Sequence, residues 1–189
     1  MRTTNLIAAL FVGLWLLPAA AEEPWLEFYW YSEKIVNRDP TPRLRIYADG
    51  EAWIYRPAYF RDPGLFAIRL AAEDINALLD ALTDPALLDA DLDALAERMA
   101  ATKAKDDRYF YTSDATITRI VFRPAHAPGA ISKSVAVREW RWKNLVTDAE
   151  RHPGIDVLER LVDVQSELQA LARRPGERLG PARPVEALQ

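Results

Sequence analysis

The side chains of this chain that are best suited to chemistry or binding are arginines and aromatics, because nucleophiles and metal ligands are scarce. The sequence has no cysteine and two histidines, which excludes thiolate zinc sites, iron–sulfur clusters and cysteine nucleophiles. His126 lies in a segment rich in proline and alanine, His152 precedes Pro153-Gly154, and neither has a second ligand at helical spacing. We therefore expect both histidines to be exposed loop residues, and we predict no metal and no cofactor.

Carboxylates are the remaining candidates for catalysis, and their surroundings predict solvated side chains. The run from Asp89 to Asp93 resembles the start of a calcium loop, but Ala94 and Ala100 occupy the places of its glycine and its bidentate glutamate. General acid–base catalysis requires a desolvated carboxylate, which the flanks of runs such as Asp106-Asp107 do not predict. No nucleophile elbow, phosphate loop or dinucleotide fingerprint is present. We predict no catalytic residue and leave the question of an enzyme open.

The clearest local signal is a β-hairpin around Asp49-Gly50. Strand-forming residues flank this pair on both sides, and Asp-Gly is typical of a two-residue type I′ turn. Such a turn places Trp53 opposite Ile46 on the core side and leaves Arg45 on the solvent side. We therefore expect Trp53 to be the main core residue of the hairpin.

A second candidate strand alternates cations with indoles. Residues 138–143 read Arg-Glu-Trp-Arg-Trp-Lys, which suits cation–π contacts or a binding strand. The alternative is that both tryptophans belong to the core and the basic side chains only keep the solvent face soluble. With the arginine side of the hairpin, the predicted binding set is Arg43, Arg45, Tyr47, Arg56, Arg138, Trp140, Arg141 and Trp142.

The rest of the pattern predicts the elements that must position this set. Hydrophobic residues at i, i+3, i+4 and i+7 predict a helix ending near Leu82, Asp84-Pro85 opens a second helix to Met99, and a long helix follows. The predicted strands cover 25–31, 64–70, 109–111, 117–122 and 134–142, and the long helix covers 155–172. An antiparallel sheet with helices packed on one face, a two-layer α+β fold, accommodates this order.

The first residues predict export. Arg2, the apolar run from Leu6 to Leu17 and the small residues Ala19-Ala20-Ala21 are typical of a secretory signal peptide over 1–21. We expect a periplasmic or secreted protein, with an uncleaved N-terminal anchor as the alternative. We expect no membrane span once the signal is cleaved.

The remaining chain predicts one α+β domain over 22–172. Short echoes, such as Tyr55-Arg56-Pro57-Ala58 against Phe122-Arg123-Pro124-Ala125, leave open that this domain consists of two repeat halves, 25–102 and 107–172. After Arg173 the chain is rich in proline and glycine, so we expect a disordered tail over 173–189.

Residues 43–53, followed by a short strand and the helix over 73–82, resemble a pattern of exported bacterial proteins of uncharacterised function. The resemblance covers about residues 43–90 and implies a hairpin, strand and helix, but no activity. A looser similarity is to the tandem-repeat proteinaceous β-lactamase inhibitors, whose cysteines this chain lacks, and it serves as analogy only.

The sequence favours a binding protein over an enzyme. A net charge of −4 argues against a general nucleic-acid binder. We expect a non-enzymatic binding or interaction module of the cell envelope, whose arginine-rich and aromatic sheet face binds a protein or an anionic envelope polymer. The alternative is an envelope hydrolase that uses carboxylates. The sequence does not predict an oligomeric state.

Overall fold

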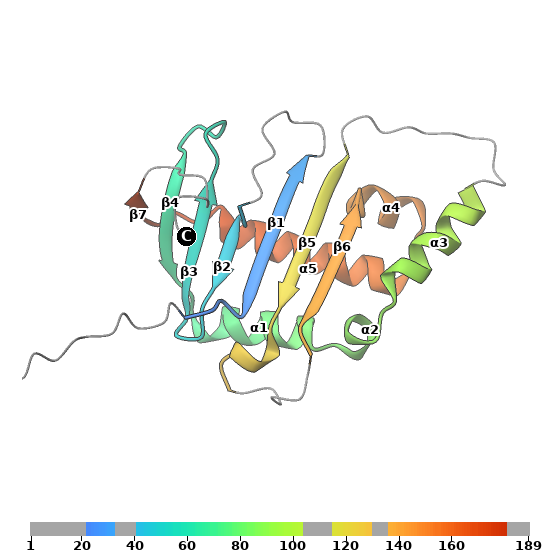
Figure 1. Cartoon of the computed structure of the whole chain (residues 1–189), viewed down its shortest axis with the longest axis horizontal. Helices are drawn as coiled ribbons and strands as arrows, with labels where there is room; N and C mark the ends of the chain where they lie inside the picture. The colour runs from blue at the N-terminus through green and yellow to red at the C-terminus, as the bar shows by residue number, and fades with distance from the viewer. Residues whose placement is uncertain (1–21, 33–40, 104–114, 130–135, 181–189) are drawn as a thin grey trace, which may run out of the picture.

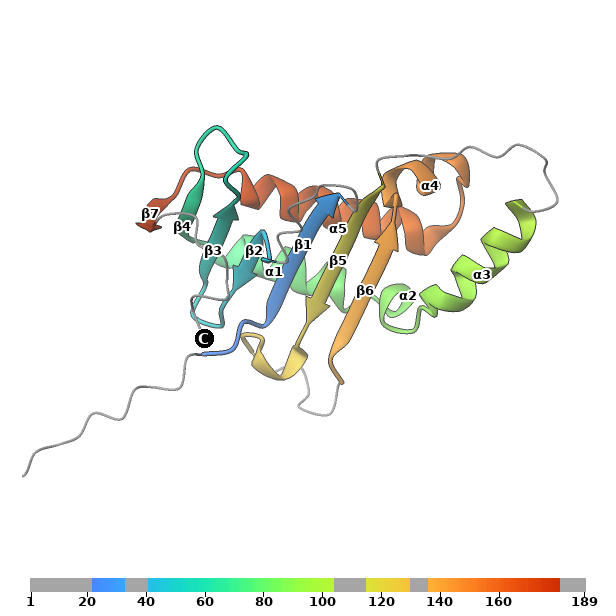
Figure 2. The same cartoon turned by 45° about the horizontal axis from the view of Figure 1, so that its top comes forward.

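The computed structural model describes residues 22–32, 41–103, 115–129 and 136–180. Within them, one seven-stranded antiparallel sheet runs in the order β6-β5-β1-β2-β3-β4-β7. The helices that cover this sheet lie behind it, on one of its faces (Figures 1 and 2). The expected two-layer α+β fold is confirmed.

The strands are short, and both chain halves contribute to the sheet. They are β1 (Leu26–Ser32), β2 (Leu44–Ile46), β3 (Glu51–Arg56), β4 (Gly64–Arg69), β5 (Thr116–Phe122), β6 (Arg138–Lys143) and β7 (Glu177–Gly180). The helices are α1 (Ala72–Leu82), α2 (Pro85–Leu88), α3 (Leu92–Lys103), α4 (Leu145–Arg151) and α5 (Asp156–Ala172), with a short 3-10 helix over Pro124–His126.

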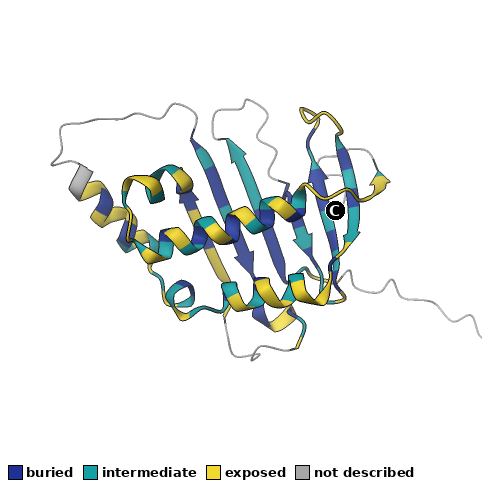
Figure 3. Cartoon of the chain, turned by 180° about the vertical axis from the view of Figure 1, so that it is seen from behind, coloured by how far each residue is buried: buried dark blue, intermediate teal, exposed yellow. Residues whose placement is uncertain are grey.

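The hydrophobic core lies between the sheet and the helices. Alternate residues of the central strands, such as Phe28 and Leu44, are fully buried, and so are Leu158 and Leu168 of α5. Seen from behind, α5 and α1 cross the sheet with their exposed residues outward (Figure 3). Burial of apolar surface contributes about 25 cal/mol per Å² to the free energy of folding. Packing of the helices on this face therefore stabilises the sheet. No described helix is long and apolar enough to span a membrane.

The predicted helices are confirmed at α1 and α5, whereas the helix predicted from Asp84 to Met99 is two helices. Asp84 caps α2, since its carboxylate accepts a hydrogen bond of 2.8 Å from the N–H of Ala86. Asp91 then caps α3 and accepts one of 2.9 Å from Ala94. The aspartate run is therefore a helix break and a cap, because a capping carboxylate satisfies a free N–H of a new first turn.

The hairpin around Asp49-Gly50 is correctly predicted, but its register is not. Gly50 has a φ of +84°, and its N–H donates to the carbonyl of Tyr47 at 3.0 Å. The connection is therefore a three-residue loop that ends in a left-handed glycine. Pairing shifts by one residue, so that Trp53 lies opposite Arg45 and Ala52 opposite Ile46. The predicted core role of Trp53 is wrong, because the shift turns its side chain to the other face.

The tail after Arg173 was expected to be disordered, and this is wrong for its first part. β7 pairs with β4, with Arg178 opposite Phe66. The guanidinium carbon of Arg178 lies 4.9 Å from the Phe66 ring centroid, a cation–π contact that helps to hold the strand. Gly176 lies so close to β4 that a Cβ atom would come within 2.6 Å of the Ala67 carbonyl oxygen. Residues 181–189 lie outside the described part of the chain.

Three further predictions are not tested by the structure. The signal peptide over 1–21 and the strand 109–111 lie outside the described residues. Both edges of β5 are occupied, by β1 and β6. β1 pairs with both β2 and β5, so the two proposed halves share one sheet. Their duplication stays a prediction.

Candidate functional site

Strand alternation points one set of side chains away from the helices, and we call this set the open face. Among the described residues, no helix lies over it (Figures 1 and 2). On the central strands and the chain next to them, the open face includes Glu27, Tyr29, Arg43, Arg45, Tyr47, Trp53, Tyr55, Arg119, Val121, Arg123, Glu139 and Arg141. The set is rich in arginine and aromatic residues.

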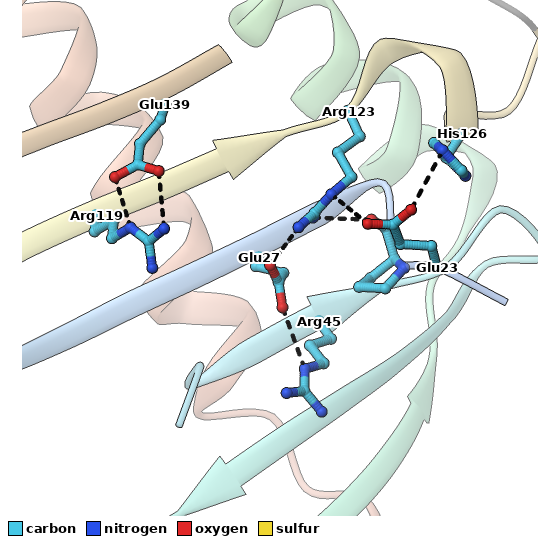
Figure 4. A network of polar contacts seen from close by, with 8 residues as sticks. Glu23, Glu27, Arg45, Arg119, Arg123, His126 and Glu139 are labelled. Carbon is cyan, nitrogen blue, oxygen red and sulfur yellow. Dashed lines mark hydrogen bonds and ion pairs between the residues drawn. The ribbon is translucent and has the colours of Figure 1, made fainter. Parts of the chain in front are cut away.

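A buried carboxylate occupies the middle of the open face. Glu27 of β1 is only 8% exposed. Its two oxygens face two guanidinium groups, with Arg45 Nε at 3.4 Å and Arg123 Nη2 at 2.9 Å (Figure 4). Buried charges require such partners, because desolvation penalises an isolated ion. Arg123 also pairs with Glu23 at 2.9 Å, and His126 Nε2 lies 3.6 Å from the other oxygen of Glu23.

A second ion pair lies beside this cluster. Arg119 Nε and Nη2 donate to the two oxygens of Glu139 at 2.7 and 2.8 Å (Figure 4). Hydrogen bonds from Arg119 lower the pKa of Glu139 below its usual value. The guanidinium carbon of Arg119 also lies 4.6 Å from the ring centroid of Tyr29, and burial raises the pKa of this tyrosine. The phenol is therefore neutral at physiological pH.

Arg43 is the second buried charge of the open face, and its surroundings differ. It is 5% exposed. Its Nε donates to the Trp30 carbonyl at 3.1 Å, and its Nη2 donates to the hydroxyl of Tyr59. Its guanidinium carbon lies 5.6 Å from the Tyr59 ring centroid and 5.4 Å from that of Phe60. Among the described residues, Nη1 has no hydrogen-bond partner.

An aromatic pair borders the Glu27 cluster on the β3 side. The ring centroids of Tyr47 and Trp53 lie 5.1 Å apart at an interplanar angle of 58°. Trp53 Nε1 donates to a carboxylate oxygen of Glu51, and burial raises the pKa of Tyr47. Both rings are half-buried, so they present fixed, partly exposed apolar area beside Arg45.

Several of the predicted binding residues come together on the open face. Arg43, Arg45 and Tyr47 lie on or next to β2, and Arg141 is exposed on β6 opposite Arg119. Arg56 does not join them, because the register shift turns it to the helix side. There it pairs with Asp62 at 3.2 Å and donates to the Arg174 carbonyl at 3.0 Å.

The two tryptophans of β6 belong to the core, as the alternative interpretation held. Trp140 is 3% exposed and Trp142 is 7% exposed. Their indole N–H groups donate to the Leu87 carbonyl at 3.0 Å and to Asp148 at 3.1 Å. Arg138 lies at the exposed start of β6, opposite Phe122, and so does not point to the open face.

Sequence reasoning missed Glu27, Tyr29, Arg119 and Arg123. The alternation of β1 carries a signal for the first two, because Leu26 and Phe28 mark the core side and leave Glu27 with Tyr29 on the other. Arg123 has no such signal. Its partner Glu27 lies 96 residues earlier in the chain, and only the β1–β5 pairing brings them together.

The open face does not favour acid–base or metal chemistry. Its carboxylates Glu27 and Glu139 form ion pairs with arginines, so their oxygens are already engaged. Within the described residues, no three side chains come together as metal ligands. On this face, arginines that are held by carboxylates lie next to partly exposed aromatic rings. No protein-family model, no curated protein and no solved structure matches this chain in the comparisons that we made, so its function has to be argued from this surface.

Proposed function

We propose that this chain is an exported binding protein of the cell envelope, and that its open face binds an acidic segment of a partner protein. Export rests on the sequence of residues 1–21, which is typical of a signal peptide. Binding rests on the arrangement of arginines and aromatic rings on the open face.

The observation that carries the proposal is that the arginines of the open face are held in place before any partner arrives. Glu27 fixes Arg45 and Arg123, and Glu139 fixes Arg119. A fixed side chain loses little conformational entropy on binding, and arginine recognises carboxylates through a planar fork of donors. Arginine, tyrosine and tryptophan are also enriched among interface hot spots.

Charge complementarity favours an acidic partner. The whole chain carries a net charge of −4, but the open face presents Arg45 on β2 and, on the far side of β1, Arg119 on β5 opposite Arg141 on β6. Local positive charge on an acidic protein steers an acidic surface to that place. The Tyr47–Trp53 pair adds apolar area that a protein segment can cover.

The test is a pull-down from envelope extract with the mature chain, in wild-type and charge-reversed forms. Arg141→Glu changes an exposed residue of the open face, and Arg173→Glu is the matched control at the exposed end of α5. We expect Arg141→Glu to lower recovery of a protein partner about tenfold, the control to leave it unchanged, and added salt to weaken it. Equal recovery by both variants, or recovery of a polymer in place of a protein, would contradict the proposal.

A further inference from the structure

We infer that Arg43, Tyr59 and Phe60 form a binding site for a carboxylate that is carried on an aromatic or apolar group. This inference rests on the proposed function, that the open face binds a partner. It adds the chemical group that one end of this face recognises. Arg43 lies directly before β2, and the two rings belong to the chain that joins β3 to β4.

Arg43 is a buried positive charge that has no counter-charge among the described residues. Only 5% of the Arg43 surface is exposed. Within the described residues, however, no carboxylate pairs with it and its Nη1 donates no hydrogen bond. A buried charged donor without an acceptor lowers stability. Glu27, two positions away across the β1–β2 pair, has two counter-charges, so the same sheet can satisfy a buried charge.

The hydrogen bonds of Arg43 define which chemical group can bind to its guanidinium group. Nε donates to the Trp30 carbonyl and Nη2 donates to the Tyr59 hydroxyl, so Nη1 is the guanidinium nitrogen that donates to no described residue. Its N–H groups require an acceptor, and a negatively charged one gives the stronger bond. The Tyr59 hydroxyl accepts from Arg43 and keeps its own proton to donate. A carboxylate can take one hydrogen bond from each of these two groups.

The aromatic rings indicate that the anion is organic. Tyr59 is 55% exposed and Phe60 is 40% exposed, and their ring centroids lie 5.4 Å apart. The rings cover the guanidinium group, so a ligand reaches Nη1 by displacing them and then packs against their faces. Contact with an aromatic or apolar group compensates for that displacement, whereas inorganic phosphate brings no such group.

The experiment compares two probes that differ only in charge, N-acetylphenylalanine and N-acetylphenylalanine amide, with inorganic phosphate as a third. Binding is measured by calorimetry and by NMR titration on the full mature chain. The variants are Arg43→Met, which keeps the aliphatic stem, and Arg173→Met, a matched loss of an exposed arginine at the end of α5, away from the open face. We expect the acid to bind wild type about tenfold more tightly than the amide, Arg43→Met to abolish this preference and Arg173→Met to retain it.

A second variant keeps the inference testable if Arg43→Met does not fold. Tyr59→Ala with Phe60→Ala changes only exposed rings, and we expect it to weaken the acid about tenfold. Equal binding of acid and amide, binding of phosphate as tight as that of the acid, or no binding of the acid to wild type would overturn the inference.

A competition experiment distinguishes a carboxylate on a protein partner from one on a free small molecule. It also distinguishes failure of the carboxylate site from failure of the proposed protein binding. If N-acetylphenylalanine displaces the partner recovered by pull-down, the carboxylate belongs to that partner; if it binds without displacement, the site takes a free small molecule, and both results support the site. Failure of the pull-down together with charge-selective binding of the acid would reject the protein partner and leave the site. Loss of charge selectivity with an intact pull-down would reject the site alone.

Discussion

Glu27 and Arg43 are both buried charges on adjacent strands of the open face, but their surroundings are opposite. Glu27 lies between Arg45 and Arg123 and is neutralised within the fold. Arg43 meets a carbonyl, a phenol and two aromatic rings, and no described carboxylate pairs with it. The first charge is part of the structure that holds the strands, and the second is the group on which the proposed carboxylate site rests.

The difference teaches that burial alone does not separate a structural charge from a functional one. A neutralised charge stabilises the fold while its partners remain, and removing one partner leaves the others desolvated and unpaired. An unneutralised charge already destabilises the fold, so its removal costs little. Stability measurements on matched variants therefore distinguish the two.

The largest effect is expected at Glu27. Glu27→Gln removes the negative charge between two half-buried arginines, and we expect the free energy of unfolding to fall by about 3 kcal/mol. Urea unfolding followed by tryptophan fluorescence measures this loss. Glu177→Gln, at an exposed residue of β7, is the control and should change stability by less than about 0.5 kcal/mol. A loss as small as the control's would mean that Glu27 does not hold the strands.

A smaller loss of stability is expected on removal of the Trp53 ring, which lies beside Glu27 and its arginines. Trp53 is half-buried on the open face and packs on Tyr47, so Trp53→Ala should lower the free energy of unfolding by about 1–2 kcal/mol. The same urea titration, followed by circular dichroism, measures it. A fully buried tryptophan would lose about 3–5 kcal/mol. A loss in that range would restore the register first predicted for the hairpin.

Removal of the guanidinium group of Arg43 should leave stability unchanged or raise it. Arg43→Met keeps the apolar stem, which contributes packing, and removes a buried donor, Nη1, that has no acceptor in the described part of the chain. We expect the free energy of unfolding to rise by up to about 1 kcal/mol. Thermal and urea unfolding measure this change. Arg45→Met is the contrast, because it leaves Glu27 with one counter-charge fewer. A loss for Arg43→Met that matched that of Arg45→Met would show that both arginines are structural.

The smallest effect concerns pH. The pKa of Glu139 is lowered in the folded state by hydrogen bonds from Arg119, so its stabilising contribution is present above the ordinary glutamate pKa and is lost as pH falls through the lowered value. The pair is partly exposed, which limits the contribution to less than about 1 kcal/mol. Unfolding of wild type and Glu139→Gln from pH 7 downward should therefore converge in acid. A constant difference across this range would rule out the ion pair as its source. Glu150→Gln, at an exposed residue of α4, is the control.

The sequence by itself determined the elements whose signals are local. The helical spacing that ends at Leu82 and the long pattern before Ala172 predict α1 and α5, because one face of each helix must be apolar to cover the sheet. The alternation of β1 and β4, and the turn at Asp49-Gly50, likewise depend on neighbouring residues. These signals were enough to predict a two-layer α+β fold with arginines on the solvent side of β2.

Only the tertiary structure decided which charges are neutralised. A single extra residue in the loop at Gly50 moved Trp53 to the open face and Arg56 to the helix side, since strand faces alternate with each residue. The pairing of β1 with β5 brought Arg123 to Glu27 across 96 positions, and no local pattern encodes such a contact. Arg43 and Arg45 are two residues apart on the same face of the sheet, and what distinguishes them is their neighbours in space: Arg45 lies against Glu27, whereas Arg43 lies under Tyr59 and Phe60.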